Sequence, residues 1–346
     1  MTDRDRLQHV LTAFGQGRLK RAVQISSGHI HATYRLTSTT GTSVAQALNP
    51  TVFTDLTACE GNLRRIGDHL AHNDRIRVPY SYQSATGSNH WVDEDAVVWR
   101  LTEFVNNTRT ILRAADIRSV HAASFAFGTY LSALADLGDP PLVATIHRFH
   151  DIAHRQQQLA TAITSNVCGR LTSAERLVVT LDELGSGLAD ALLHLDAFEL
   201  LPVHNDAKVA NVRFNKRLTH VSHVLDLDTT MPGLALFDIG ELLRSATAST
   251  PEDATDPTTI VVRPSFVAAV INGFSTGAGA AFSQAERDLL PDVAAIMAFE
   301  NALRMLTDYL DGDVYFPATS PTHNLVRARA QVEIARQLIE LRPTID

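Results

Sequence analysis

Two polar stretches carry most of the information in this chain: His204-Asn205-Asp206-Ala207-Lys208-Val209-Ala210-Asn211 and Val224-Leu225-Asp226-Leu227-Asp228. In the first stretch, an aspartate precedes an asparagine by five residues. A second aspartate follows that asparagine after a further fifteen residues, at the end of an apolar run. Each residue type is common by itself, but this order and spacing of residues rarely arises by chance over so short a span. The pattern therefore predicts a site rather than a solvated loop.

The order and spacing of these side chains match what phosphoryl transfer from ATP requires. Asp206 is placed to accept the proton of an attacking hydroxyl, and Asn211 and Asp226 supply oxygen ligands that hold Mg²⁺ against the phosphates. The ammonium group of Lys208 is expected to meet the charge that develops on the transferred phosphoryl group. We therefore predict catalytic roles for Asp206 and Lys208, and metal-binding roles for Asn211 and Asp226.

The same residues have other interpretations. An aspartate before a strand commonly forms a turn or cap, an asparagine in a loop forms an Asx turn, and a Leu-Asp-Leu-Asp alternation is typical of a half-exposed strand. A metallohydrolase is the rival function, because two-metal hydrolases use clusters such as His204, Asp206, Asp226 and Asp228. Such enzymes usually need further ligands on separate loops, and the neighbouring histidines form no recognisable ligand set. The long ordered pattern favours the kinase interpretation.

Composition narrows the class of partner. The chain has 346 residues, of which 45% are hydrophobic and 20% charged, an ordinary globular balance with room for two domains. A formal net charge of −8 and a pI near 6.0 argue against a nucleic acid or an anionic membrane. Cys59 and Cys168 lie in no metal-like spacing. Because we find no signal-peptide core and no apolar run of membrane-spanning length, we expect a soluble cytoplasmic protein that binds small molecules.

The predicted secondary structure changes from mostly strands to mostly helices near residue 106. After a short opening helix, strands are expected within residues 23–36 and at 44–48, 76–82 and 91–105, with one helix at 56–70. Amphipathic helices are expected at residues 117–137, 152–163 and 173–193, and again after the strand-like region 206–228. We therefore predict an α+β fold with two lobes: a small strand-rich N-terminal lobe (residues 1–106) and a larger helical C-terminal lobe (residues 107–346).

The N-terminal lobe is expected to bind the nucleotide, with one departure from the kinase pattern. Ser27 and Gly28 lie in a small-residue turn whose N–H groups can cover phosphates, although an ordinary hairpin turn explains the same residues. Protein kinases place a lysine on the third strand, and here that strand carries Gln46 instead. The only lysines of the chain are Lys20, Lys208 and Lys216. Gln46 or an arginine from elsewhere must therefore take the place of that lysine.

Two further polar residues are expected to support the loop rather than to react. Asp238 follows the second stretch, where it either caps the next helix or accepts hydrogen bonds from the backbone around His204. His204 is predicted to orient the loop, because Asp206 already fits the task of the base.

Two longer motifs are much more specific than the shared kinase residues. They are Asp-x-Asp-Thr-x-Met-Pro-Gly at residues 226–233 and Leu-x-Gly-Asp-Val-Tyr-Phe at residues 310–316. Together with further blocks they make nearly the whole chain resemble the N-acetylhexosamine 1-kinases, a branch of the aminoglycoside-phosphotransferase-like kinases. The further blocks include Ser27-Gly28-His29-Ile30, Trp99-Arg100, Phe149-His150-Asp151 and His323-Asn324-Leu325.

This resemblance implies a two-lobed protein-kinase-like fold of the aminoglycoside phosphotransferase type, with ATP and Mg²⁺ as cofactors. It further implies phosphorylation of the anomeric (C1) hydroxyl of a hexosamine such as N-acetylglucosamine or N-acetylgalactosamine. By residue matching, Asp206 corresponds to the base, and Asn211 and Asp226 to the metal ligands. Sugar contacts are implied for Arg304, Tyr315, Asp228 and His31, and nucleotide contacts for Ser27, Gly28, Gln46, Glu103 and Val105.

Departures from the family pattern leave the acceptor open. Ala47 stands where a basic residue is expected after Gln46, and His31 and Ala207 replace small polar residues. Because specificity depends on pocket shape and a few hydroxyl contacts, the sugar itself is not predicted. The alternatives are an aminoglycoside, choline or other small-alcohol phosphotransferase on the same fold, and a catalytically inactive nucleotide-binding module.

Overall fold

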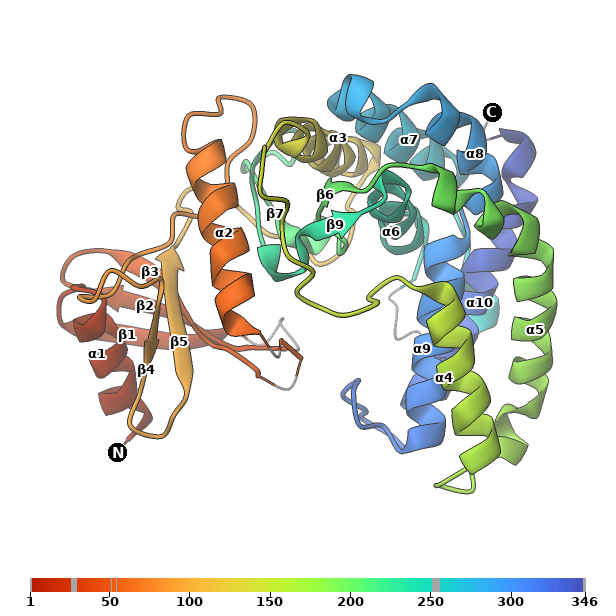
Figure 1. Ribbon diagram of the computed structural model, residues 1–346, viewed down its shortest axis with the longest axis horizontal. Coiled ribbons are helices and arrows are strands. Elements are labelled where there is room, and N and C mark those ends of the chain that lie inside the picture. Colours follow the sequence, from red (N-terminus) through yellow and green to blue (C-terminus); the bar gives the residue numbers. More distant parts are fainter. Residues whose placement is uncertain (1, 26–29, 51, 54, 251–255, 345–346) are drawn as a thin grey trace.

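The computed structural model describes residues 2–25, 30–50, 52, 53, 55–250 and 256–344, arranged in two lobes (Figure 1). The lobe that contains the N-terminus holds a five-stranded sheet, and the lobe that contains the C-terminus is mostly helical. Ser27 and Gly28, which the sequence predicts to bind nucleotide, lie outside the described residues.

The small lobe is an antiparallel sheet with a helix on each side. The strands lie in the order β1-β2-β3-β5-β4, so that β5 is paired on both edges by β3 and β4. Figure 1 shows α1 on the outer face of the sheet and α2 on the side that faces the large lobe. The elements are α1 (Asp3–Ala13), β1 (Leu19–Ile25), β2 (Ala32–Ser38), β3 (Thr42–Ala47), α2 (Leu56–Leu70), β4 (His90–Val92) and β5 (Val98–Glu103).

Side-chain alternation gives the sheet two different faces. Residues of a strand point alternately to opposite sides, and Ala45, Trp99 and Leu101 turn toward α1 to form a small apolar core with its buried leucines. Their neighbours Gln46 and Arg100 therefore point to the other face. The two residues are direct cross-strand partners on β3 and β5, so the inner face carries polar groups toward the large lobe.

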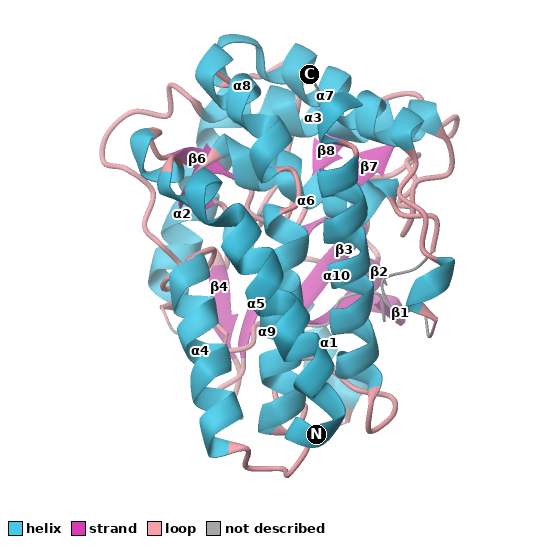
Figure 2. Ribbon diagram, turned by 90° about the vertical axis from the view of Figure 1, so that its right-hand side faces the viewer, coloured by secondary structure: helices cyan, strands magenta, loops and turns pink. Residues whose placement is uncertain are grey.

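The large lobe is built of helices around one extended core, with two short two-stranded sheets, β6–β9 and β7–β8, inserted. Helices α4, α5 and α10 pack beside α9, as Figure 2 shows from the side of this lobe. The elements are α3 (Ile117–Leu134), α4 (Ile152–Ser165), α5 (Leu171–Leu193), β6 (Leu201–Val203), β7 (Val212–Phe214), β8 (Val221–Val224), β9 (Met231–Gly233), α6 (Ala235–Thr247), α7 (Pro264–Ala278), α8 (Gln284–Val293), α9 (Ile296–Asp311) and α10 (His323–Glu340).

Helices α3 and α7 approach each other unusually closely because glycines line their contact. A Cβ atom added at Gly277 would lie 2.2 Å from the backbone oxygen of Phe125, and one added at Gly128 would lie 2.2 Å from that of Phe274. Real Cβ atoms do not tolerate such distances, so both positions require glycine for the two backbones to touch. Helix α3 of this pair also packs against β6 and β8.

The prediction of a strand at residues 76–82 is wrong. The segment forms only isolated bridges, from Arg77 to His223 of the large lobe and from Ser81 to Thr102 of the small lobe. It passes from one sheet to another, and Pro79 has no N–H to donate, so no continuous ladder forms. The stretch expected at 91–105 is a β4–β5 hairpin rather than one run.

Most other expected elements are confirmed within a few residues, among them the opening helix as α1, the helix at 56–70 as α2 and the helices at 117–137, 152–163 and 173–193 as α3, α4 and α5. Ile66 and Leu70 of α2 pack into the core of the large lobe, and the boundary after residue 106 stays a prediction. Among the described residues, no helix is both long and apolar enough to cross a membrane.

Candidate active site

The β7–β8 hairpin brings the two predicted metal ligands together. Val212 pairs with Val224, so the residue before β7 and the residues after β8 lie at the same end of the hairpin. The N–H of Leu225 donates to the backbone oxygen of Asn211 at 2.8 Å. Asn211 and Asp226 are therefore neighbours in space although fifteen residues separate them in the chain.

The loop after β6 is fixed by two buried polar side chains. Asp238, in the first turn of α6 and fully buried, accepts hydrogen bonds from the N–H groups of His204 at 2.9 Å and Asn205 at 2.7 Å. Of the two roles expected for Asp238, the structure shows this one, and α6 begins without a side-chain cap. Burial raises the pKa of Asp238, and these bonds and the neighbouring His204 partly oppose that rise.

His204 ties this loop to the end of β8. Its Nδ1 accepts the N–H of Asp206 at 3.2 Å, which places the ring proton on Nε2. Nε2 then donates to the backbone oxygen of Leu225 at 2.8 Å. Because both ring nitrogens are used in this way, His204 orients the segment that carries Asp206 relative to the segment that carries Asp226.

Asp206 has two polar partners from its own loop. The amide nitrogen of Asn211 donates to the backbone oxygen of Asp206 at 2.9 Å and to its carboxylate at 3.0 Å. The ammonium group of Lys208 lies 2.7 Å from the other carboxylate oxygen. Asp206 remains partly accessible, and its position next to a cation and an amide keeps the carboxylate oriented. Because the Asn211 nitrogen points at Asp206, its amide oxygen is the atom available to a cation.

Asp226 sits among carboxylates in a left-handed backbone conformation, with φ of +60°, which aspartate tolerates better than most residues. The residue is exposed to solvent, but nearby protein partly desolvates its carboxyl group. This desolvation, together with the negative charges of Asp228 and Asp206, raises the pKa of the Asp226 carboxyl. A bound cation would relieve the repulsion.

These residues fit a magnesium ion that is shared with a nucleotide. Mg²⁺ commonly takes one or two protein oxygens and completes its shell with phosphates and water. Asp226 and the amide oxygen of Asn211 provide that number. In the described part of the chain, no group of three or more His, Cys, Asp or Glu residues is arranged to hold a metal ion.

Asp228 links the metal-binding segment to the small lobe through a buried ion pair. Arg100 of β5 donates to both carboxylate oxygens of Asp228, with one bond at 2.6 Å, and both residues are buried. Burial acts to raise the pKa of Asp228, but the charge and hydrogen bonds of Arg100 and a bond from His31 hold it well below its usual range.

His31 and Gln46 complete this polar group. The N–H of Asn49 donates to His31 Nδ1 at 3.1 Å, so His31 Nε2 carries the proton toward Asp228 at 3.1 Å. The side-chain oxygen of Gln46 accepts from Arg100 Nε at 2.9 Å. Asp228 and His31 thus bind each other here, and their contacts with a sugar stay predictions, as does the contact of Gln46 with nucleotide.

The remaining predicted nucleotide residues lie where the two lobes join. A carboxylate oxygen of Glu103, the last residue of β5, accepts the N–H of Tyr80 at 3.1 Å. The backbone oxygen of Val105 accepts from Thr108 at 2.7 Å and from Arg213 at 3.0 Å. These bonds fix the connection between the lobes, and the nucleotide contacts of both residues stay predictions.

Arg304 and Tyr315, predicted to contact the sugar, lie together. Arg304 of α9 is 3.5 Å from the Tyr315 hydroxyl, and its guanidinium lies over the rings of Phe149, Tyr315 and Phe316 at 5.2 to 5.6 Å. The loop that carries the last two rings is held by Asp308, which accepts their N–H groups at 2.7 and 2.9 Å. The result is an arginine framed by aromatic rings.

A buried charge cluster connects this arginine to the Asp206 loop. Glu300, fully buried, lies 2.7 Å from His150 Nδ1, 3.6 Å from Arg155 and 3.8 Å from Arg304. The other ring nitrogen of His150 lies 2.8 Å from the backbone oxygen of Asn205. Both nitrogens of His150 thus face acceptors, which suits the doubly protonated, cationic ring.

The pKa values of this pair shift in opposite directions. Burial acts to lower the pKa of His150, but the charge of Glu300 and the hydrogen bonds to Glu300 and Asn205 raise it overall. Burial acts to raise the pKa of Glu300, yet His150, Arg304 and Arg155 hold it below its usual range. Three cationic groups therefore surround one carboxylate, beside the residue that precedes Asp206.

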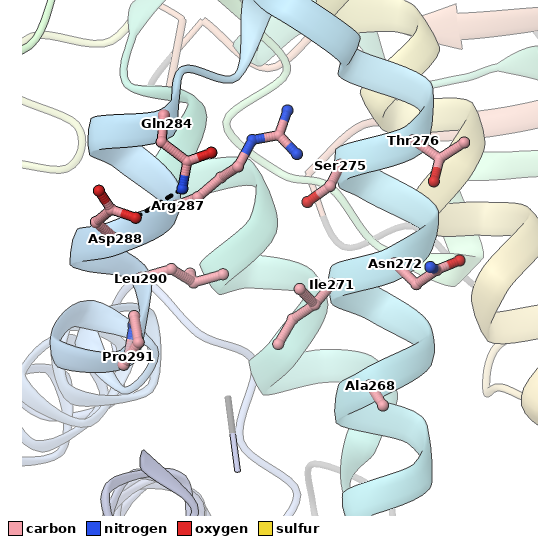
Figure 3. Close-up of a pocket in the computed structure, with 10 residues that line it drawn as sticks. All are labelled: Ala268, Ile271, Asn272, Ser275, Thr276, Gln284, Arg287, Asp288, Leu290 and Pro291. Atoms are coloured by element: carbon pink, nitrogen blue, oxygen red, sulfur yellow. Dashed lines mark hydrogen bonds between the residues drawn. The ribbon is translucent and has the colours of Figure 1, made fainter. Parts of the chain in front are cut away.

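A separate hollow of about 790 Å³ lies between α7 and α8, away from these residues. Figure 3 shows Gln284 hydrogen-bonded to Asp288 on one wall and Ile271 on the other. Arg287 donates to the backbone oxygens of Gly279 and Phe282, so its guanidinium is already used. The hollow gathers no reactive set of side chains, and the site described above remains the candidate.

Comparisons with known proteins show the family to which the chain belongs. Residues 21–281, well over half of the chain, match the phosphotransferase enzyme family. The chain therefore belongs to this family of phosphotransferases, which replaces the metallohydrolase alternative.

Similar solved structures include a microcompartment-associated aminopropanol kinase, with 13% identity, a TM-score of 0.63 and coverage of 98% of both chains. An aminoglycoside phosphotransferase from Alicyclobacillus acidocaldarius subsp. acidocaldarius DSM 446 has 13% identity and a TM-score of 0.61, covering 94% of this chain and 92% of that one. Spectinomycin phosphotransferase APH(9)-Ia, in complex with ADP and spectinomycin, has 11% identity and a TM-score of 0.58, covering 97% and 98%. At these identities the likeness shows the fold, and the two-lobed kinase-like fold predicted from the sequence is confirmed.

Four residues of the site were not among those predicted from the sequence: Arg100, His150, Arg155 and Glu300. A signal existed for Arg100, since it is a basic residue between the apolar Trp99 and Leu101, in a lobe that needs a cation. His150 lies in one of the blocks that carry the sequence resemblance, but its partner is 150 residues away. Such pairs follow from tertiary packing and leave no local pattern.

Proposed function

We propose that this phosphotransferase uses ATP and Mg²⁺ to phosphorylate the anomeric hydroxyl of a neutral hexosamine such as N-acetylglucosamine or N-acetylgalactosamine. The observation that carries the proposal is the cationic cluster of His150, Arg155 and Arg304 around the buried Glu300, joined to the Asp206 loop through Asn205. Arg304, for which the sequence resemblance implies a sugar contact, is part of this cluster.

Within this proposal the roles of the loop residues follow from their contacts. Asp206 accepts the proton of the attacking hydroxyl, with its carboxylate oriented by Lys208 and Asn211. Lys208 then offers positive charge near the transferred phosphoryl group. Asn211 and Asp226 are the residues that would hold Mg²⁺, which when bound neutralises charge on the nucleotide phosphates. Asp238 and His204 keep these groups in register.

The charge of the cluster favours a neutral acceptor over a cationic one. Aminoglycosides, choline and amino alcohols carry positive charge, and three cationic groups facing one carboxylate would repel them. The nearby carboxylate of Asp308 accepts hydrogen bonds from the backbone N–H groups of Tyr315 and Phe316. The planar guanidinium of Arg304 suits pairs of oxygen atoms, which a hexosamine presents. An N-acetyl group removes the charge of the sugar amine.

A panel of acceptors tests the proposal. ADP release with Mg-ATP would be measured for N-acetylglucosamine, N-acetylgalactosamine, glucosamine, an aminoglycoside and choline. We expect turnover with an N-acetylhexosamine and little with the cationic acceptors. Asp206→Ala should lower that turnover by about 100-fold or more, whereas the exposed control Asp196→Ala should leave it unchanged.

Other outcomes select the alternatives. Turnover only with a cationic acceptor would refute the neutral-sugar proposal and favour an aminoglycoside or choline phosphotransferase. Nucleotide binding without turnover on any acceptor would favour the inactive nucleotide-binding module.

A further inference from the structure

The small lobe lacks the lysine that kinases use to bind the nucleotide phosphates, and its inner face carries an arginine instead. Lys20, the one lysine before the C-terminal lobe, is exposed at the start of β1. On β3, Gln46 occupies the inner face, and its cross-strand partner on β5 is Arg100. Adjacent strands are only about 4.8 Å apart, so a long side chain from β5 reaches the space above Gln46.

The contacts of Arg100 leave part of its guanidinium unused. Arginine has five N–H donors. The Nε donor binds Gln46, and one donor on each terminal nitrogen binds Asp228. The second N–H on each terminal nitrogen makes no hydrogen bond within the described ranges, although the side chain is only about 7% exposed. Buried donors without partners are costly, which points to a ligand that supplies acceptors.

Glu60 of α2 places a second carboxylate near the Arg100 guanidinium. It is buried, and its Oε1 makes no hydrogen bond with any described residue. Burial raises the pKa of Glu60, and among the nearby charges that oppose this rise Arg100 is the strongest. In kinases the third-strand lysine pairs with a glutamate of the helix beside the sheet, and Glu60 stands on that helix.

We infer that Arg100 takes the place of the third-strand lysine: it binds nucleotide phosphate oxygens with its two remaining donors, while Gln46 and Asp228 hold its guanidinium in position. The inference rests on the proposed use of ATP and adds which side chain of the small lobe binds the phosphates. The bidentate bond to Asp228 also couples phosphate binding in the small lobe to the segment of Asp226. Charge-assisted bonds of this kind are among the strong hydrogen bonds in proteins.

Calorimetric titration with ADP and with adenosine, without any acceptor, tests this role. The key variant is Arg100→Gln/Asp228→Asn, which removes both buried charges and so leaves no unpaired one; Asp228→Asn alone is its reference. Arg21→Gln removes an exposed arginine from the same sheet as a control. Circular dichroism would check that each variant is folded.

We expect the double variant to bind ADP about tenfold or more weakly than Asp228→Asn, and adenosine within about twofold of it. Arg21→Gln should match the wild type for both ligands. Equal ADP affinity in the folded double variant and its reference would overturn the role of Arg100 while leaving the proposed function intact. A wild type that does not bind ADP would refute the proposed function, and the role of Arg100 with it.

Discussion

Glu300→Gln tests the buried charge cluster on which the acceptor proposal depends. The substitution keeps the shape of the side chain but removes the carboxylate that faces His150, Arg155 and Arg304 at 2.7, 3.6 and 3.8 Å. Removing one partner of a buried ion pair usually costs about 3–5 kcal/mol. Because His150 can lose its proton, we expect a cost near the lower end of that range.

The cost should depend on pH in a defined direction. The pKa of His150 is raised in the folded protein, so its contribution is complete below its unfolded pKa, roughly 6.5, and is lost as pH rises through the raised value. The pKa of Glu300 is lowered, so its contribution is complete above its unfolded pKa, about 4.3, and is lost as pH falls through the lowered value. The destabilisation should be largest between these limits and shrink at alkaline pH.

Urea unfolding of wild type and Glu300→Gln across this pH range measures the effect. Glu175→Gln, the same change at an exposed position of α5, should alter the free energy of unfolding by less than about 0.5 kcal/mol. In the double variant His150→Gln/Glu300→Gln, the cost should be less than the sum of the single changes. A Glu300→Gln protein within about 1 kcal/mol of wild type at every pH would refute the charged-pair reasoning.

Two further predictions concern packing and the Asp206 loop. Gly277→Ala should destabilise the protein by about 1–3 kcal/mol in thermal or urea unfolding, because a Cβ there would overlap the backbone of α3. The control Gly187→Ala, with open space around it, should be neutral or stabilising. Equal effects of the two substitutions would contradict the close α3–α7 contact. Asp238→Asn should lower the free energy of unfolding by about 1–3 kcal/mol and also lower kcat, since two buried N–H groups lose a charged acceptor. A kcat equal to that of the exposed control Asp190→Asn would show that the loop does not depend on this side chain.

The parts of the site that the sequence could predict are those set by local order. Asn211 and Asp226 flank a hairpin whose two strands are close in sequence, so their meeting follows from the pairing of Val212 with Val224. The helices of the large lobe were likewise predictable from apolar periodicity. These features need only short-range information.

The rest depends on contacts between distant segments. Arg100 meets Asp228 across 128 residues, and His150 meets Glu300 across 150. The segment 76–82 was wrongly predicted for the same reason: its residues suit a strand, but its ends pair with different lobes. In each case the pairing is set by tertiary packing between segments that are far apart in the sequence.

The position of the phosphoryl group on the product tests the central proposal most directly. Mg-ATP and N-acetylglucosamine or N-acetylgalactosamine would be incubated with the enzyme, and the product examined by ³¹P–¹H coupling in nuclear magnetic resonance spectra. We predict a phosphorus coupled to the anomeric proton, formed by the wild type and not by Asp206→Ala. Phosphorylation at any other hydroxyl, or the same product from Asp206→Ala at the wild-type rate, would contradict the proposal.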